Sequence, residues 1–325
     1  MSKSIVIGVD VGGTFTDTLA LDEATGAVRV EKVPSTKGDQ SNGFLSGILA
    51  ATDHDLSSVS TIIHGTTVAT NALLERKGAK AGIITTEGFR DVLEMRRRDR
   101  PSTWGLWGQF TPVIERKCRL EVPERTLANG TVVKDVDEAS IKAAAQDLIA
   151  QGCESVCLFF INGYANTDNE TKAARILRQV WPNDYVSVAT EILPEIREFE
   201  RCSTASLNAY LQPVVANYLA RLETRIAEDD AGSEILIVQS NGGIMSVDTA
   251  KALPVRTALS GPAAGVVAAR KIAKAAGFEN VITCDMGGTS FDVSLVADGQ
   301  NMLTSQASID FGMVIRTPMI EMSTI

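Results

Sequence analysis

The sequence is poor in histidine and cysteine, and it contains no long hydrophobic run. With only His54 and His64, a histidine-rich zinc site is excluded. The five cysteines lack the spacing of metal ligands, and Cys153 and Cys157 stand in an apolar segment as expected core thiols. No segment reaches the roughly 18 apolar residues of a membrane-spanning helix, and the N-terminus lacks a signal-peptide layout. These absences predict a cytoplasmic protein with no membrane partner.

Positive charge is also scarce. The formal net charge is −9, and a nucleic-acid partner would require a basic face, so the composition argues against nucleic-acid binding. A polyphosphate ligand would have to be held by backbone N–H groups, a metal and a few local cations. The hydrophobic fraction of 44% and the charged fraction of 22% are those of an ordinary globular protein with a proper core.

Apolar runs typical of strands alternate with helical periodicity along most of the chain. Strands are expected over residues 4–10, 16–21 and 28–33, and a long helix over 204–227. This alternation predicts an α/β fold with a mixed sheet.

Residues 87–135 interrupt this alternation. The arginine-rich run 96–100 precedes Trp104 and Trp107, and prolines follow. We expect an inserted lobe or a long functional loop rather than sheet core. An exposed interaction loop is the favoured interpretation of the arginine and tryptophan residues.

Two similar D-x-G-G-T motifs stand near opposite ends of the chain. Asp10, Gly12, Gly13 and Thr14 are matched by Asp285, Gly287, Gly288 and Thr289, and Asp17 is matched by Asp292. In both copies an apolar run ends in the aspartate, glycines form a turn, and a second apolar run follows. A supersecondary unit that recurs in the same context is structural evidence, although each copy alone could be a plain hairpin turn.

Paired glycines suit a phosphate site because their backbone can approach a ligand closely and direct N–H groups at it. Thr14, Thr16, Thr289 and Ser290 add uncharged hydroxyl donors. A carboxylate beside a triphosphate is repulsive unless a divalent metal lies between them, so Asp10 and Asp285 imply Mg²⁺, bound through water. A P-loop and a Rossmann motif are both missing.

This pair of hairpins resembles the phosphate-binding hairpins of the actin, hexokinase and heat-shock-chaperone ATPases. A closer resemblance is to the hydantoinase A/5-oxoprolinase family, which includes the ATP-using subunits of acetone and acetophenone carboxylases. The segments that carry this resemblance are 8–17, 64–72, 88–91, 193–198, 239–243, 260–265 and 285–292.

The resemblance implies RNase H-like lobes with mixed sheets: a first ATPase lobe over 1–276, with the insertion at about 87–135, and a second lobe only begun over 277–325. It implies that ATP phosphorylates a carbonyl oxygen of a lactam or hydantoin before ring-opening hydrolysis. It also implies that the chain works with a second, hydantoinase B-like subunit. A ketone carboxylase subunit is the related alternative. The adenosine-contacting motif is expected beyond Ile325, so a non-catalytic nucleotide-binding fragment is the third possible function.

Three further segments are candidates for the site. His64 and Thr67 stand where an apolar run meets an expected helix, and we predict catalytic roles for them, with Asn71 facing the substrate. The alternative for His64 is a hydrogen-bonded residue at a strand end. Asn241, together with Ser260 and Gly261 at the start of a helix rich in small residues, is predicted to line the substrate site.

Overall fold

The computed structural model describes residues 3–36, 39–97, 110–229, 232–287, 291–310 and 312–324. The chain folds as two compact units, which we describe separately. Unit 1 comprises Met1–Asn71, Val215–Ser305 and Pro318–Ile325, and unit 2 comprises Ala72–Val214 and Gln306–Thr317. The lobe boundary predicted at residue 276 remains a prediction.

Unit 1 contains a six-stranded mixed sheet in the order β12-β11-β4-β1-β2-β3. The central strand β1 is parallel to β4 and antiparallel to β2, and β4 is parallel to β11. The predicted mixed α/β architecture is therefore confirmed. The bounds are β1 (Ile5–Val11), β2 (Phe15–Asp22), β3 (Val28–Pro34), β4 (Val59–Thr66), β11 (Glu234–Val238) and β12 (Ile244–Ser246).

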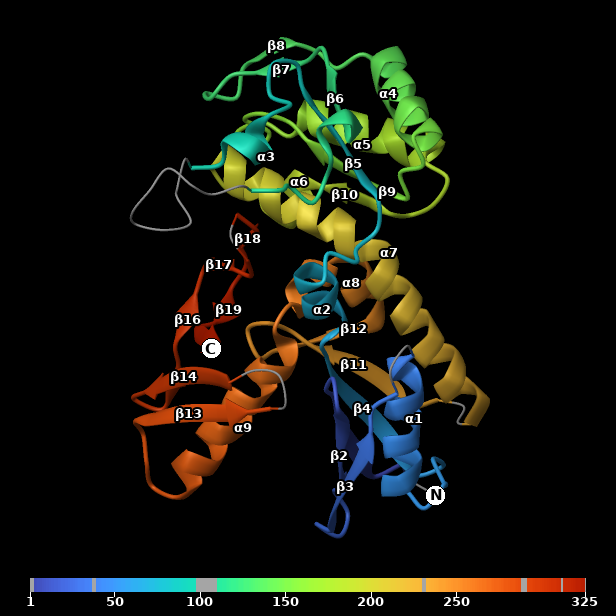
Figure 1. Cartoon of the computed structure of the whole chain (residues 1–325), viewed down its shortest axis with the longest axis vertical. Helices are drawn as coiled ribbons and strands as arrows, with labels where there is room; N and C mark the ends of the chain where they lie inside the picture. The colour runs from blue at the N-terminus through green and yellow to red at the C-terminus, as the bar shows by residue number, and fades with distance from the viewer. Residues whose placement is uncertain are drawn as a thin grey trace. The chain divides into compact units, whose positions relative to one another are not determined.

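Helix α1 (Gln40–Ala51) covers one face of strands β1 to β3 (Figure 1). Asp39 caps its N-terminus by accepting a hydrogen bond from the Ser41 N–H at 3.1 Å. The glycines of α1 allow close approach, since a Cβ at Gly47 would overlap the hydroxyl of Thr18 on β2. The apolar side chains of α1 thereby reach the sheet and are buried.

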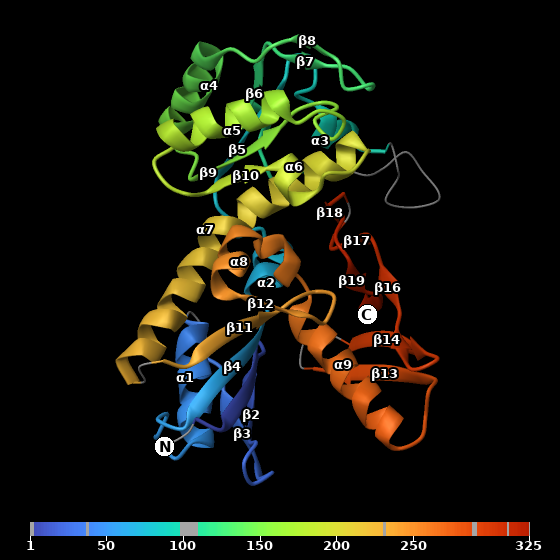
Figure 2. The ribbon, with the colours of Figure 1, turned by 180° about the vertical axis from the view of Figure 1, so that it is seen from behind.

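A second sheet of unit 1 packs against helix α9 (Ser260–Ala275), which lies across one of its faces (Figures 1 and 2). Buried Ala263, Val266, Val296 and Ile320 form the core between them. The remaining elements here are β13 (Val281–Met286), β14 (Phe291–Ala297), β15 (Gln300–Asn301), β16 (Leu303–Thr304), β19 (Met319–Ile320), β20 (Met322–Thr324), α8 (Val247–Ala252) and η2 (Pro254–Thr257).

Unit 2 is built on a four-stranded parallel sheet in the order β10-β9-β5-β6. Strand β6 (Arg119–Val122) lies within the segment that we expected to remain outside sheet core, and it pairs with β5 (Ala81–Thr86). The expectation was wrong for these four residues: Arg119–Val122 alternates between polar and apolar residues as a strand does, but so short a run is a weak signal among the arginine and proline residues around it. The other elements are α3 (Val92–Met95), η1 (Arg116–Cys118), β7 (Arg125–Thr126), β8 (Val132–Lys134), α4 (Glu138–Ala150), β9 (Ser155–Phe159), α5 (Asp168–Val180), β10 (Val186–Val188), α6 (Ala189–Ile192), β17 (Ala307–Ser308) and β18 (Val314–Ile315).

Two helices, α2 (Val68–Leu74) and α7 (Glu198–Asp229), contain residues of both units. The long helix expected over 204–227 corresponds to α7, which begins six residues earlier and ends two residues later. None of the helices in the described part of the chain is long and apolar enough to span a bilayer.

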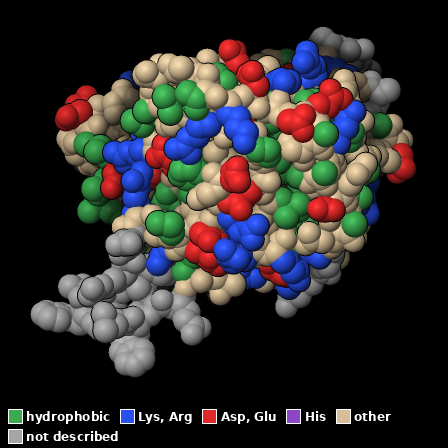
Figure 3. Space-filling model, turned by 90° about the horizontal axis from the view of Figure 1, so that it is seen from above, with side chains coloured by type: hydrophobic (Ala, Val, Ile, Leu, Met, Phe, Trp, Pro, Cys, Tyr) green, Lys and Arg blue, Asp and Glu red, His purple; other side chains and the backbone are tan. Residues whose placement is uncertain are grey.

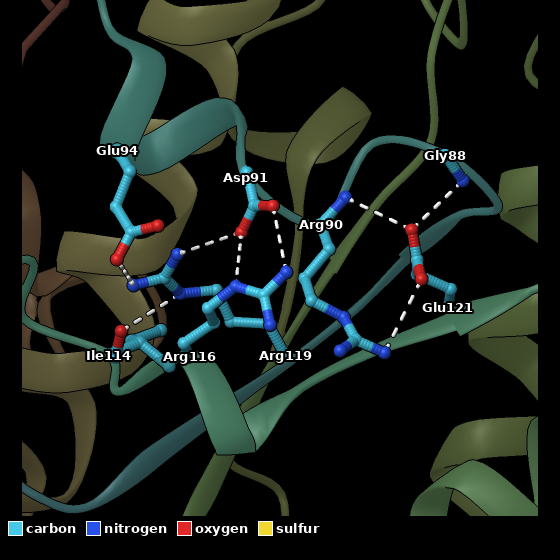
Figure 4. A network of polar contacts seen from close by, with 8 residues as sticks. All are labelled: Gly88, Arg90, Asp91, Glu94, Ile114, Arg116, Arg119 and Glu121. Carbon is cyan, nitrogen blue, oxygen red and sulfur yellow. Dashed lines mark hydrogen bonds and ion pairs between the residues drawn. The ribbon is translucent and has the colours of Figure 1, made fainter.

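A network of charged residues holds the segment that follows β5 in place through hydrogen bonds and ion pairs (Figure 4). The buried guanidinium of Arg119 donates from Nε to the Ile114 carbonyl at 3.0 Å, and Arg116 forms two hydrogen bonds with Asp91 at 2.8 and 2.9 Å. Glu121 accepts hydrogen bonds from backbone N–H groups of the same segment. The charges are balanced locally, which suits a structural role. Residues 98–109, with both predicted loop tryptophans, lie outside the described residues.

On the face drawn in Figure 3, acidic and basic side chains are interspersed. Among the side chains that the structure describes there, no continuous basic surface of the kind that binds nucleic acid is visible.

Candidate functional site

The two repeated motifs of unit 1 fold as hairpins with the same register. Asp10 on β1 pairs with Asp17 on β2, and Asp285 on β13 pairs with Asp292 on β14. In the first hairpin the Gly12 N–H donates to the Phe15 carbonyl at 3.0 Å, which closes the turn. The predicted ligand contacts of Gly288, Thr289 and Ser290 fall outside the described residues and remain predictions.

Both hairpins line one cavity of about 280 Å³. Small-molecule pockets in proteins occupy about 300–1,000 Å³, so this cavity suits one end of a nucleotide better than a whole one. Among the described residues of the lining, Lys32 supplies the single basic side chain, against four carboxylates. The lining consists of Asp10, Gly12, Gly13, Thr14, Phe15, Asp17, Lys32, Thr67, Gly261, Pro262, Asp285, Met286, Gly287 and Asp292.

Helix α9 meets both leading carboxylates through glycines one turn apart. A Cβ at Gly261 would lie 3.0 Å from Asp10 Oδ1, and a Cβ at Gly265 would lie 3.8 Å from Asp285 Oδ2. Gly65, at the end of β4, borders Asp10 as well, since a Cβ there would lie 3.3 Å from the same oxygen. Residues four apart share one helix face, so the small residues of α9 leave space for both aspartates.

The start of α9 is held in a strained conformation beside this cavity. Leu259 precedes the helix with φ +61°, a left-handed conformation that is uncommon for a residue with a branched side chain. Its N–H donates to Thr70 Oγ1 at 2.9 Å. Ser260 Oγ accepts from the Thr66 N–H at 3.3 Å and donates to the Thr66 carbonyl at 3.1 Å. These bonds fix Gly261 against Asp10.

The electrostatics of the cavity centre on Asp10. Burial by surrounding protein atoms and the negative charges of Asp17 and Asp285 raise the pKa of Asp10 to about 6, and Lys32 opposes this rise. The residue still keeps solvent-accessible surface. Lys32 Nζ forms hydrogen bonds with both carboxylate oxygens of Asp17, at 2.7 and 2.9 Å. Concentrated negative charge raises the pKa of a carboxyl group, and a bound cation would offset that charge.

The predicted residue Thr16 does not line the cavity. Its side chain is buried on the opposite face of β2, where Oγ1 lies 3.0 Å from Ser35 Oγ. Side chains alternate between the two faces of a strand, so Phe15 and Asp17 face the cavity while Thr16 faces α1. The predicted phosphate contact of Thr16 is therefore corrected to a core contact.

His64 is also absent from the cavity lining. Its ring is fully buried, with Nδ1 3.2 Å from the Val9 carbonyl and Nε2 2.9 Å from the Tyr218 hydroxyl. Burial lowers the pKa of His64 to about 4, so the ring is neutral at pH 7. A carbonyl only accepts, so Nδ1 carries the proton and Nε2 accepts from Tyr218. This geometry favours the alternative interpretation of His64 as a hydrogen-bonded strand residue.

Of the residues predicted to face substrate, only Gly261 lines the cavity. Asn71 donates to Thr67 Oγ1 at 3.3 Å, and Thr67 Oγ1 donates to the Val11 carbonyl at 3.2 Å. Asn241 Oδ1 accepts from the Gly243 N–H at 2.9 Å within its own turn. These side chains shape loops of unit 1, and contact between Asn71, Asn241 or Ser260 and a substrate remains a prediction.

The sequence reasoning missed Lys32 and gave no role to Asp17, Asp292 or Gly65. Asp17 and Asp292 could have been found from the alternation of the strands, because a cross-strand partner of Asp10 or Asp285 lies on the same face. Lys32 pairs with Asp17 across β2 and β3. This register depends on a turn that the sequence pattern does not fix by itself.

Asp10→Asn is expected to stabilise the chain when metal and nucleotide are absent. The folded-state pKa lies above the ordinary value of 3.8, so the wild type loses stability as the pH rises from about 4 to about 6, and asparagine avoids this loss. The solvent-accessible carboxylate limits the gain to about 1 kcal/mol at pH 7.5. Thermal melts at pH 7.5 and pH 4 would measure it. An equal difference in Tm at both pH values would contradict the assigned titration.

Comparison with known proteins places the chain in a family. Residues 6–181 match the hydantoinase/oxoprolinase N-terminal region, and residues 201–325 match the hydantoinase/oxoprolinase domain. The chain therefore belongs to the hydantoinase/oxoprolinase family, and the resemblance noted in the sequence is confirmed.

Similar proteins act on lactams and on ketones. The chain is 32% identical to caprolactamase subunit alpha of Pseudomonas jessenii, over 98% of this chain and 47% of that subunit. The crystal structure of ATP-dependent caprolactamase from Pseudomonas jessenii matches with a TM-score of 0.87 and 33% identity, over 98% of this chain and 48% of the other. A nucleotide-free acetone carboxylase structure matches with a TM-score of 0.86 and 28% identity, over 98% and 47%. The chain thus spans about half the length of these relatives.

Proposed function

We propose that the chain forms the phosphate-binding part of an enzyme that uses ATP to phosphorylate a carbonyl oxygen of a lactam or hydantoin, before ring-opening hydrolysis. An amide carbonyl is a poor electrophile, and a phosphate on its oxygen is a good leaving group. The observation that carries the proposal is the convergence of two equivalent hairpins, each with its own carboxylate, on one cavity of unit 1.

Each part of the cavity has a role in this proposal. Backbone N–H groups of the glycine turns, other than the Gly12 N–H that donates to the Phe15 carbonyl, bind phosphate oxygens, and Thr14 adds a hydroxyl donor. Lys32 neutralises part of the phosphate charge. To do so, its ammonium group leaves Asp17 and contacts the phosphate instead. The tight packing of Gly261 keeps the Asp10 carboxylate directed into the cavity. Catalysis then consists of positioning and charge neutralisation, which dominate phosphoryl transfer.

The residues present fit Mg²⁺ held mainly by water and phosphate. Within the described ranges no group of three or more histidine, cysteine or acidic side chains converges on one point. Mg²⁺ is commonly bound by one or two carboxylates plus waters and substrate phosphates, and Asp10 and Asp285 supply two. Asp10 and Asp285 would hold the ion, which would neutralise charge that develops during transfer.

The remaining architecture also belongs to this proposal. We infer RNase H-like lobes of the actin and hexokinase type, with a second lobe that continues the β13–β14 sheet, and a second, hydantoinase B-like subunit. The relative named caprolactamase subunit alpha supports a multi-subunit enzyme.

A ketone carboxylase subunit is the second candidate. It is favoured by the similarity to acetone carboxylase, whose TM-score of 0.86 nearly equals that of caprolactamase. The same cavity serves both reactions, because each requires transfer of phosphate to a carbonyl or enolate oxygen.

ATP hydrolysis by the full-length protein with its partner subunit would separate the two candidates. We expect Mg²⁺-dependent turnover that 5-oxoproline, hydantoin or caprolactam stimulates at least tenfold. Stimulation by acetone or acetophenone only when bicarbonate is present would instead establish carboxylation. Absence of turnover with every substrate, although the complex assembles, would refute an ATP-dependent enzyme.

A further inference from the structure

Two carbonyl groups of β1, on either side of Asp10, accept hydrogen bonds from side chains. The Val9 carbonyl lies 3.2 Å from His64 Nδ1, and the Val11 carbonyl accepts from Thr67 Oγ1 at 3.2 Å. His64 belongs to β4, and Thr67 stands between β4 and α2. One short segment of the chain therefore holds β1 immediately before and after the carboxylate that borders the cavity.

Each of these two side chains is oriented by a further donor. The Tyr218 hydroxyl, on α7, lies 2.9 Å from His64 Nε2, and Asn71 Nδ2 donates to Thr67 Oγ1 at 3.3 Å. A neutral imidazole that accepts at Nε2 carries its proton at Nδ1, so Tyr218 selects the tautomer that donates to β1. A hydroxyl has a single proton and the Asn71 amide nitrogen only donates, so the proton of Thr67 goes to the β1 carbonyl.

The ring of His64 lies on the sheet face that α1 covers, away from the cavity. It is 0% exposed, and it packs edge-on against Phe44 of α1 with 4.8 Å between the ring centroids. Among the described residues that line the cavity, Thr67 is present and His64 is absent. An influence of His64 on a ligand in the cavity must therefore pass through the backbone of β1.

The planarity of the peptide bond extends the hold on each carbonyl to the next residue. Because a peptide group is planar, a fixed carbonyl also fixes the N–H and the Cα that follow it. The Val9 carbonyl precedes Asp10, so His64 sets the backbone from which the carboxylate projects. The other carbonyl precedes Gly12, so Thr67 sets the first glycine of the turn.

We propose that His64 and Thr67 are positioning residues that hold the Asp10 carboxylate in a fixed geometry relative to the glycine turn. The inference rests on the proposed function, in which Asp10 holds the cation and the turn binds phosphate. A displacement of about 1 Å in an active site costs roughly 10²-fold in rate, so the relative geometry of these two groups matters. Tyr218 and Asn71 support this role, because they orient the two donors.

Two substitutions of His64 separate positioning from packing. An asparagine amide nitrogen is as many bonds from Cα as Nδ1, and a glutamine amide nitrogen is as many as Nε2. His64→Asn therefore keeps the donor to the Val9 carbonyl, whereas His64→Gln keeps only the contact with Tyr218. In the full-length protein we expect His64→Gln to weaken Mg²⁺-ATP binding at least tenfold and His64→Asn to retain most of the affinity. Calorimetry measures both dissociation constants.

A double-mutant cycle shows whether His64 acts through Asp10. In the Asp10→Ala background, His64→Gln should cause no further loss of affinity, because no carboxylate remains to be positioned. Ser155→Ala is the matched control, since it removes a buried hydrogen bond to the Ala209 carbonyl in unit 2. It should lower the melting temperature and leave Mg²⁺-ATP binding unchanged, which separates lost stability from lost positioning.

Three results would overturn the positioning role: wild-type affinity in His64→Gln, equal losses in His64→Asn and His64→Gln, or a loss of the same size with and without Asp10. If His64→Gln does not fold, Thr67 provides the second test. Thr67→Ser keeps the hydroxyl and should retain most of the affinity, whereas Thr67→Val should lose at least tenfold, and equal affinities would overturn the role. Wild-type affinity in Asp10→Ala would instead refute the cation site of the proposed function, and the positioning role with it.

Discussion

Replacing Asp10 with alanine is expected to reduce the Mg²⁺-dependent ATP turnover that we propose, assayed together with the proposed partner subunit, by on the order of 10³-fold. Asp10 ends β1 at the cavity lined by both hairpins, and Gly261 and Gly65 pack against its carboxylate. The variant would lose the negative charge that we propose positions the cation, while the surrounding backbone remains. Turnover and metal affinity should both be measured, since loss of a metal contact lowers both.

A control for Asp10→Ala is Glu31→Ala. Glu31 lies on β3 beside Lys32, but it pairs with Arg29 and does not line the cavity. We expect this variant to retain wild-type turnover. If Asp10→Ala retained wild-type turnover in a complex that binds nucleotide, Asp10 would have no part in the reaction, and the two-hairpin interpretation would lose its main support.

Gly261→Val is expected to weaken nucleotide binding at least tenfold. A Cβ at this position lies 3.0 Å from Asp10 Oδ1, closer than real Cβ contacts usually come, and the branches of valine would press further into the cavity. Gly65 borders the same oxygen, since a Cβ there would lie 3.3 Å from Asp10 Oδ1, so this end of the carboxylate is already closely packed. The dissociation constant of Mg²⁺-ATP, measured by calorimetry on the full-length protein, would report the change.

Gly265→Ala is the matched control on the same helix. There a Cβ would lie 3.8 Å from Asp285 Oδ2, an ordinary van der Waals distance, and alanine has a higher helix propensity than glycine. We expect this variant to bind nucleotide as the wild type does and to be at least as stable. Equal affinities for Gly261→Val and the wild type would show that the cavity beside Asp10 is not where phosphate binds.

Local patterns determined a large part of this protein. Each hairpin is specified by neighbours in sequence: an apolar run, a glycine turn and a second apolar run, so its existence and the strand-end position of Asp10 and Asp285 could be predicted. The mixed sheet followed from the alternation of strand and helix periods. The recurring motif, together with the other matching segments, identified the family. It also led us to propose phosphate binding, because glycine turns and carboxylates have the required properties wherever they lie.

Tertiary structure alone decided where side chains point and which distant residues meet. Thr16 turns to α1 because only alternate residues of its strand face the cavity. His64 is neutral because it is buried, and its Nε2 contacts the hydroxyl of Tyr218, which is distant in sequence. Lys32 reaches the cavity through the register of β3 on β2. The contact of Gly261 with Asp10 joins segments about 250 residues apart. Such contacts depend on the packing of whole elements, which local propensity and periodicity do not encode.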